Sequence, residues 1–157
     1  MKNKPYKTIF KNLDEMYKCV GDELGLTEWI EIKQSDINSF AKLTQDEQWI
    51  HIDKDKSLKQ SPFKNTIAHG FMILSYCTKF AYESFEIISI NMGLNYGLDR
   101  VRFPSPTPSG GFIRARVKLI EMDLKPGHAK YKIGISVELK NHEKPVCVAE
   151  FLAMVYE

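Results

Sequence analysis

Residues 66–85 read TIAHGFMILSYCTKFAYESF, a mostly apolar segment long enough for about five helical turns. Small and large apolar residues lie on nearly all sides of its helical wheel, so the sequence predicts a helix that is buried on most sides rather than along one stripe. A chain can bury such a helix only by surrounding it with other elements. The rest of the sequence therefore has to supply a surface that encloses it.

Strand-like segments follow the helix and can form that surface. Residues 112–122 and 131–139 alternate between apolar and polar side chains, which is typical of strands with one buried face. Residues 145–156 are apolar on both faces, as expected of a central strand covered from two sides. The pattern predicts an α+β fold in which an antiparallel sheet wraps around one long buried helix. Such a sheet leaves edges, so we expect a dimer that pairs them.

The first 45 residues favour two helices. Asn12 followed by Glu15 forms a capping-box pattern, and apolar residues at helical spacing then run to Leu24, with Gly25 as a natural stop. Ser35 could cap a second helix that ends near Asp46. That helix would turn four apolar side chains inward: Ile37, Phe40, Ala41 and Leu43. Residues 28–32 are a candidate for a short strand between the two helices.

Composition narrows the class of protein. A chain of 157 residues with no linker or repeat is most simply one domain, and a net charge of +2 gives no support to a nucleic-acid surface. Its three cysteines are far apart in sequence, which favours free thiols in a reducing compartment over a disulfide framework or a zinc site. No apolar stretch suits a membrane span or a signal peptide. We therefore expect a cytoplasmic protein without a metal ion.

Two short stretches contain the residue types of an acid/base site. Asp46 and His51 lie in LTQDEQWIHIDKDK, and His69 with Gly70 begins the apolar helix. Alone, each has an ordinary structural interpretation as a cap, a solvated charge or a core histidine. Together they place a carboxylate and an imidazole near a helix start, where unpaired N–H groups can polarise a carbonyl oxygen. A glycine there lets a ligand approach the backbone closely, and the Asp and His can hold a water and move its protons.

Three segments resemble one known family. They are QDEQWIH around Asp46 and His51, SPFKNTIAHGF over residues 61–71, and NYGLDRVRFPSPTP over residues 95–108. In that order they resemble the MaoC-like family, the hot-dog-fold (R)-specific enoyl-CoA hydratases, and in particular its nodulation-protein-N-like branch. The resemblance spans nearly the whole chain, so it implies a single MaoC-like hot-dog domain over residues 1–157.

The resemblance also implies roles for individual residues. Asp46 and His51 would be the catalytic pair, and the Gly70 N–H would bind the thioester carbonyl oxygen of a 2-enoyl-CoA. Water held by the pair would add across the double bond to give an (R)-3-hydroxyacyl-CoA, with no cofactor beyond the CoA of the substrate. The division of acid and base roles within the pair stays open, because two such groups titrate together. The remaining candidates for substrate binding are His69, Gln48, Asn95 and Arg100.

Other positions carry weaker interpretations. Gln45 and Lys64 stand where the family or its branch often has glycine. The hydroxyl of Thr78 is expected to bond its own helix backbone, although a role in the site is an alternative. Cys77 is expected to be a core residue. One or two basic side chains could meet the CoA phosphates, among Lys54, Lys56, Lys59, Lys64, Arg114 and Arg116.

Two other functions stay open at this stage. A hot-dog acyl-CoA thioesterase would use a carboxylate to drive water onto the thioester carbon, and it would release a free thiol. A non-catalytic module would only bind acyl-CoA or support dimerisation. The joint presence of Asp46, His51 and Gly70 favours the hydratase over both.

Overall fold

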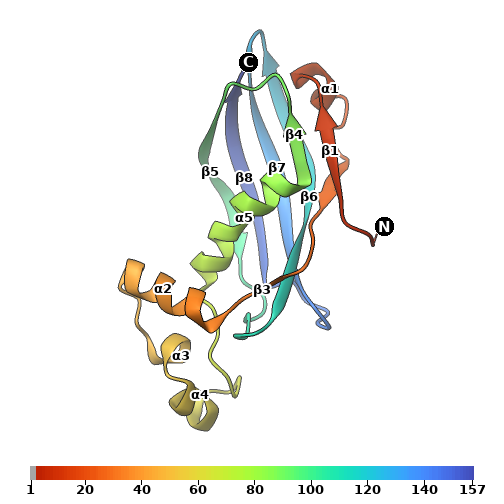
Figure 1. The fold of residues 1–157 in the computed structure, drawn as a ribbon. Helices are drawn as coiled ribbons and strands as arrows, with labels where there is room; N and C mark the ends of the chain where they lie inside the picture. The colour runs from red at the N-terminus through yellow and green to blue at the C-terminus, as the bar shows by residue number, and fades with distance from the viewer. Residues whose placement is uncertain (1–2) are drawn as a thin grey trace.

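The computed structural model describes residues 3–157, which form five helices and eight strands (Figure 1). The helices are α1 (Leu13–Tyr17), α2 (Gln34–Thr44), α3 (Trp49–Ile52), α4 (Lys54–Gln60) and α5 (Gly70–Ser84). The strands are β1 (Tyr6–Phe10), β2 (Glu23–Leu26), β3 (Ile30–Glu31), β4 (Phe85–Ile87), β5 (Met92–Arg102), β6 (Phe112–Lys125), β7 (His128–Leu139) and β8 (Cys147–Tyr156).

The strands form one sheet in the order β4-β1-β2-β6-β7-β8-β5, with the short β3 paired to β6. Every pairing is antiparallel except that of β1 with β4. Helix α5 lies across one face of this sheet, and α2, α3 and α4 gather beyond one end of it (Figure 1). The predicted α+β fold, an antiparallel sheet around one long helix, is confirmed. Within residues 3–157, no helix is long and apolar enough to cross a membrane.

Helix α5 is buried on the side that faces the sheet. Met72, Ile73 and Phe80 are at most 4% exposed, and they pack into the core with the inward side chains of β6, β7 and β8. On the other side, Phe71 is 70% and Tyr82 is 73% exposed. The prediction that this helix is buried on most sides is therefore wrong for the single chain, because the sheet covers only one of its faces.

The first predicted helix is much shorter than its apolar spacing suggested. The cap is confirmed, since the Asn12 side chain accepts a hydrogen bond from the Glu15 N–H. The helix then ends at Tyr17, and after a turn Glu23–Leu26 form β2 instead of continuing it. Gly21 turns the chain with a φ of 97°, and β2 pairs with both β1 and β6. Sheet pairing thus overrides a helical periodicity that is real but short.

The second predicted helix is α2, with two differences. It begins after Lys33, and Ser35 is not its cap. Ile37 and Ala41 are buried as predicted and Phe40 is half-buried, but Leu43 is 82% exposed. The last turn of α2 extends past the core, so its apolar residue faces solvent. The expected short strand at residues 28–32 is β3.

The three strands predicted from the second half of the chain are present. β6 and β7 alternate between buried inner residues and more exposed outer ones, as their sequences indicated. β8 lies between β7 and β5, so it is an inner strand. Its second face is only partly covered in the single chain. The prediction that β8 is covered from two sides is therefore wrong for the single chain.

Candidate active site

Two histidines lie face to face at the start of α5. His51 comes from α3 and His69 is the N-cap residue of α5. Their ring centroids are 3.7 Å apart with an angle of 25° between the planes, and both side chains are almost fully buried. The ring of Phe40 from α2 contacts His69 with a centroid distance of 5.1 Å. Residues far apart in sequence thus hold both imidazoles in fixed orientations.

The hydrogen bond of His51 determines which of its nitrogens is free. Its Nδ1 lies 2.7 Å from the carbonyl oxygen of Ile67, and a carbonyl can only accept, so Nδ1 carries the proton. In neutral His51 the lone pair is therefore on Nε2. Burial lowers the pKa of His51 below its ordinary 6.5 and His69 acts in the same direction, while the bond to Ile67 and the charge of Asp46 oppose them. Near neutral pH, His51 is thus an acceptor.

Asp46 completes the cluster. The Nε2–H of His69 donates to the backbone oxygen of Asp46 at 2.9 Å, and the Asp46 carboxylate Oδ2 lies 4.0 Å from the same nitrogen. One polar atom each from Asp46, His51 and His69 lie within 4.8 Å of one another. The carboxylate is 57% exposed and so meets solvent, whereas both imidazoles lie beneath it. The three residues can therefore hold a water between a fixed charge and a neutral imidazole.

The same three side chains bear on the question of a metal ion. Two imidazoles and a carboxylate are ligands that zinc prefers. The lone pair on Nδ1 of His69 has no hydrogen-bond partner among residues 3–157. The absence of a metal ion consequently stays a prediction from the sequence.

Gly70 is the first residue of α5 and directly follows His69. A Cβ at this position would lie 2.9 Å from Cδ2 of Phe103, closer than such contacts allow. The first N–H groups of an α-helix have no partner within the helix and carry the positive end of its dipole. Glycine thus lets the segment after β5 approach the helix start, next to the two histidines.

Sequence reasoning did not find two residues that hold the site together. Gln34, the first residue of α2, donates from its side chain to the backbone oxygen of His51 and accepts from the hydroxyl of Thr66. It thereby ties α2, α3 and the segment before α5 to one another. Phe103 contacts Gly70 and lies in a segment that carried the family resemblance, so that segment was a signal for it. Gln34 has no local signal, because its role depends on three elements meeting.

Three predicted binding residues lie apart from this cluster. Gln48 is exposed at the start of α3, where its side chain makes no capping hydrogen bond. Asn95 and Arg100 are exposed on β5. Asn95 lines a cavity on the other half of α5, whereas Arg100 does not. Binding roles for these three residues stay predictions.

The basic residues proposed for CoA phosphates fall into two groups. Arg114 and Arg116 both form ion pairs with Glu138, on the polar face of β6, so they are engaged within the sheet. Lys56 lies over the ring of Trp49 at 4.9 Å. The other lysines of the set are exposed and free to reach an anionic ligand near α4: Lys54, Lys59 and Lys64.

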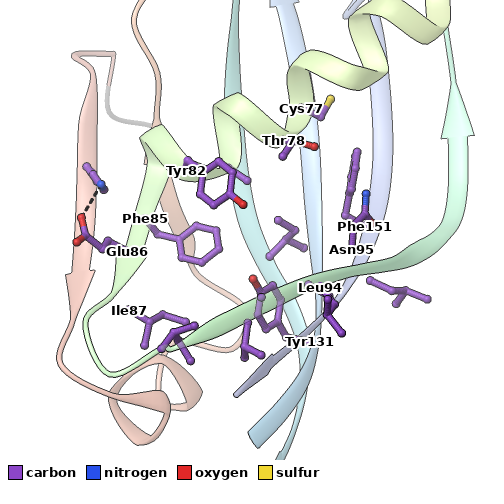
Figure 2. Close-up of a pocket in the computed structure, with 18 residues that line it drawn as sticks. Cys77, Thr78, Tyr82, Phe85, Glu86, Ile87, Leu94, Asn95, Tyr131 and Phe151 are labelled. Atoms are coloured by element: carbon purple, nitrogen blue, oxygen red, sulfur yellow. Dashed lines mark hydrogen bonds and ion pairs between the residues drawn. The ribbon is translucent and has the colours of Figure 1, made fainter. Parts of the chain in front are cut away.

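The cavity has a volume of about 460 Å³ and lies between the C-terminal half of α5 and strands β5, β7 and β8 (Figure 2). Its lining is largely apolar, with Phe85, Ile133 and Phe151 among the buried residues. Asp46, His51, His69 and Gly70 do not line it. The helix thus carries polar chemistry at its first turn and an apolar cavity along its second half.

Two residues of α5 near this cavity had sequence interpretations. The hydroxyl of Thr78 makes no hydrogen bond within residues 3–157 and lines the cavity, so the expected bond to its own helix is wrong. Cys77 is fully buried, and its contact with Cys147 together with burial raises the pKa of its thiol. Cys77 is therefore a core residue, as predicted, and its raised pKa keeps the thiol protonated.

Two residues that stand where the family or its branch often has glycine both adopt the left-handed backbone conformation. Gln45 has a φ of 60° at the end of α2, and Lys64 has a φ of 56°. Gln45 directly precedes Asp46, and Lys64 lies in the segment that leads to His69. The chain thus keeps a conformation that favours glycine without using glycine there.

We expect Lys64→Gly to raise the free energy of unfolding by up to about 1 kcal/mol. Removing the left-handed strain gains roughly 1–2 kcal/mol, and the greater freedom of glycine in the unfolded chain offsets part of this gain. Lys64→Ala is the control, since it removes the charge and keeps the strain. Urea unfolding of the three proteins measures the effect, and equal stability of both variants would contradict it.

The chain matches a known family over most of its length. Residues 16–141 match the model of the MaoC like domain family. The chain is 36% identical over 142 residues to 3-hydroxyacyl-thioester dehydratase Z of Mycobacterium tuberculosis, covering 90% of this chain and 93% of that protein. It is 38% identical over 146 residues to nodulation protein N of Rhizobium leguminosarum bv. viciae, covering 92% and 91%.

Solved structures agree on the fold. A monoamine oxidase regulatory protein from Archaeoglobus aligns with a TM-score of 0.79 at 22% identity, over 95% of this chain and 96% of that one. R-hydratase PhaJ1 from Pseudomonas aeruginosa aligns with a TM-score of 0.71 at 20% identity, over 88% and 82%. The class that the fold defines is thus the hot-dog fold. Within that class the chain belongs to the MaoC-like dehydratase family.

Proposed function

We propose that the chain is an (R)-specific enoyl-CoA hydratase, which adds water to a trans-2-enoyl-CoA to give an (R)-3-hydroxyacyl-CoA. The observation that carries this proposal is that Asp46 and His51 meet beside the glycine that begins α5. Membership of a dehydratase family supports a hydro-lyase, because dehydration of a 3-hydroxyacyl thioester is the same reaction in reverse. We propose no cofactor other than the CoA of the substrate.

In this mechanism the thioester oxygen accepts a hydrogen bond from the backbone N–H of Gly70. That bond and the helix dipole favour the negative charge that develops on the oxygen. A water bound by Asp46 and the free Nε2 of His51 loses a proton to this pair, and its oxygen forms the bond to carbon 3. The carbon–carbon π electrons move toward the carbonyl, and carbon 2 takes up a proton. Atoms and charges balance because the pair returns the proton that it removed.

His69 acts in this mechanism as a positioning residue. Its Nε2–H is used by the backbone of Asp46, and its ring supports the ring of His51. It therefore fixes the separation between the carboxylate and the imidazole rather than touching the substrate. Such support matters because a misplacement of 1 Å at a catalytic group costs about 100-fold in rate.

The apolar cavity supplies a place for the acyl chain. The cavity lies along the second half of α5, whereas Gly70 begins the helix. Because a helix rises about 1.5 Å per residue, Thr78 in the cavity lies roughly 12 Å along the helix axis from Gly70. A thioester held at Gly70 by its oxygen would direct a medium-length chain over that distance. Apolar lining then contributes affinity in proportion to the chain surface removed from water.

We expect kcat/KM for hydration to fall in acidic solution along a limb whose midpoint lies below pH 6.5. The reaction needs His51 neutral, and burial lowers its pKa below 6.5, so protonation removes activity only in more acidic solution. A profile of kcat/KM between pH 5 and pH 8 measures this limb. An acidic limb centred above pH 6.5 would contradict the assigned role of His51.

We also propose that the chain forms a homodimer through β5. This strand is an edge of the sheet and, within residues 3–157, pairs only with β8, and it exposes the apolar side chains of Leu94, Tyr96 and Leu98. We expect light scattering to give twice the mass of 18.1 kDa. Leu98→Lys, which adds a charge to the edge, is expected to shift the protein toward monomer. A wild-type mass of one chain would contradict the proposal.

A cytoplasmic location stays a prediction.

The test of the proposed reaction is hydration of crotonyl-CoA, followed as loss of the conjugated enoyl absorbance. Turnover to the (R) product, identified by chiral analysis, is the expected result. Release of free CoA without hydration would identify a thioesterase. No turnover with short or medium enoyl chains by a folded protein would favour a non-catalytic acyl-CoA-binding or dimerisation module.

A further inference from the structure

A tyrosine hydroxyl lies on the floor of the apolar cavity. Tyr131 of β7 is 8% exposed, and its ring packs edge-on against Phe85 at 6.1 Å. Its hydroxyl has no hydrogen-bond partner among residues 3–157. Burial raises the pKa of Tyr131 to about 12, so the group stays protonated and remains a donor. The oxygen is not among the fully enclosed unpaired polar atoms of residues 3–157, so it opens into the cavity, and a bound chain that covers it would have to supply its partner.

Two further hydroxyls line the same cavity. Thr78 and Tyr82 are four residues apart on α5, so they lie on the same face of the helix. Neither hydroxyl is hydrogen-bonded within the described part of the chain. Figure 2 shows the oxygens of Tyr82 and Tyr131 directed toward the space between them, with the amide of Asn95 on another side of the cavity. Polar groups from three elements thus converge in a mostly apolar cavity.

We propose that this cavity binds the far part of an acyl chain that carries an oxygen atom, a hydroxyl or a carbonyl, rather than a plain alkyl chain. The inference rests on the proposed function, in which the thioester is held at the start of α5. A plain chain would leave the Tyr131 hydroxyl without water and without a partner, whereas a chain oxygen satisfies it. The apolar wall formed by Ile133, Phe151 and Val155 covers the rest of the chain.

The position of the hydroxyls along α5 sets the place of that oxygen. Thr78 and Tyr82 lie roughly 12 and 18 Å along the helix from Gly70. The oxygen therefore belongs many carbons away from the thioester, on a chain of about ten carbons. It is distinct from the oxygen that hydration places on carbon 3.

Calorimetric titration with saturated thioesters tests this inference. Decanoyl-CoA is compared with hydroxydecanoyl-CoA isomers that carry the hydroxyl at carbon 6, 8 or 10. These ligands lack the double bond, so binding is measured whether or not the protein hydrates enoyl thioesters. We expect at least one isomer to bind about tenfold more tightly than decanoyl-CoA. Tighter binding of decanoyl-CoA than of every isomer would overturn the inference.

Tyr131→Phe removes only the hydroxyl on the cavity floor. We expect it to abolish the preference for the hydroxylated chain, about tenfold, and to tighten the binding of decanoyl-CoA, which then leaves no hydroxyl unpaired. Tyr76→Phe is the matched control, because Tyr76 is on α5 but does not line the cavity. Tyr82→Phe, at an exposed position, gives a second variant that folds independently of the core.

The outcomes separate the inference from the proposed function. If the wild type does not hydrate crotonyl-CoA but still binds hydroxydecanoyl-CoA more tightly than decanoyl-CoA, the proposed hydratase activity is rejected and the inference about the cavity stands. If the protein hydrates crotonyl-CoA but Tyr131→Phe changes the dissociation constants of plain and hydroxylated thioesters equally, the inference about an oxygenated chain is rejected and the hydratase activity stands. That second result would be expected if side chains of another copy of the chain fill the cavity.

Discussion

Replacing His51 with Gln, or Asp46 with Asn, is expected to lower kcat for crotonyl-CoA hydration by about 100- to 10,000-fold. Gln keeps a polar group near the Ile67 carbonyl but cannot take a proton, and Asn keeps the shape of Asp without its charge. The double variant is expected to be little worse than either single one, because the two groups act as a unit on one water. Steady-state kinetics and single-turnover measurements on all three variants test this result.

Matched controls use the same substitutions elsewhere on the chain. His142→Gln and Asp123→Asn change an exposed turn histidine and an exposed carboxylate, and we expect near wild-type turnover from both. Circular dichroism shows whether each variant folds. Wild-type turnover by a folded His51→Gln variant would contradict a role of His51 in proton transfer, and the same result for Asp46→Asn would contradict that of Asp46.

Gly70→Ala is expected to lower kcat by about 100-fold, the cost of a displacement of 1 Å at a catalytic group. The added Cβ would lie 2.9 Å from the ring of Phe103, so either the ring or the start of α5 has to move. Phe103 is 39% exposed and can yield in part, which limits the loss of stability, and the rate loss arises from the remaining displacement of the start of α5.

Phe103→Ala in the Gly70→Ala background provides the test of that cause. Removing the ring makes space for the methyl group, and we expect it to restore at least tenfold of the lost rate. Phe103→Ala alone serves as the control for changes at the ring itself. An unrestored rate in the double variant would contradict the steric cause and would indicate that the methyl group obstructs the thioester.

The sequence indicated strands β3, β6, β7 and β8, because strand patterns depend on local chemistry. Strands β6 and β7 follow from their alternation, since each has one face that the core must cover, and β8 follows from its continuous apolar run. β5 was not predicted as a strand, because its residues are mostly exposed and show no alternation in burial. β2 was taken for the end of a helix, because four residues carry too short a pattern to separate the two periods.

The site shows a similar division. Asp46, His51, His69 and Gly70 could be selected from the sequence, since their residue types and order suit the chemistry of a helix start. The stacking of the two imidazoles, and which nitrogen of His51 is free, depend on Ile67 and on the support of Gln34. Such features arise when several elements meet, so no single segment contains them.

The place of β8 between β7 and β5 has a consequence for biosynthesis. β5 pairs with β8, and its residues leave the ribosome long before residues 147–156 are made. During that interval α5 has no complete sheet to cover its apolar face, and β5 has no neighbouring strand. Such long-range pairing slows folding and exposes aggregation-prone surface. The nascent chain therefore exposes apolar surface until residues 147–156 emerge.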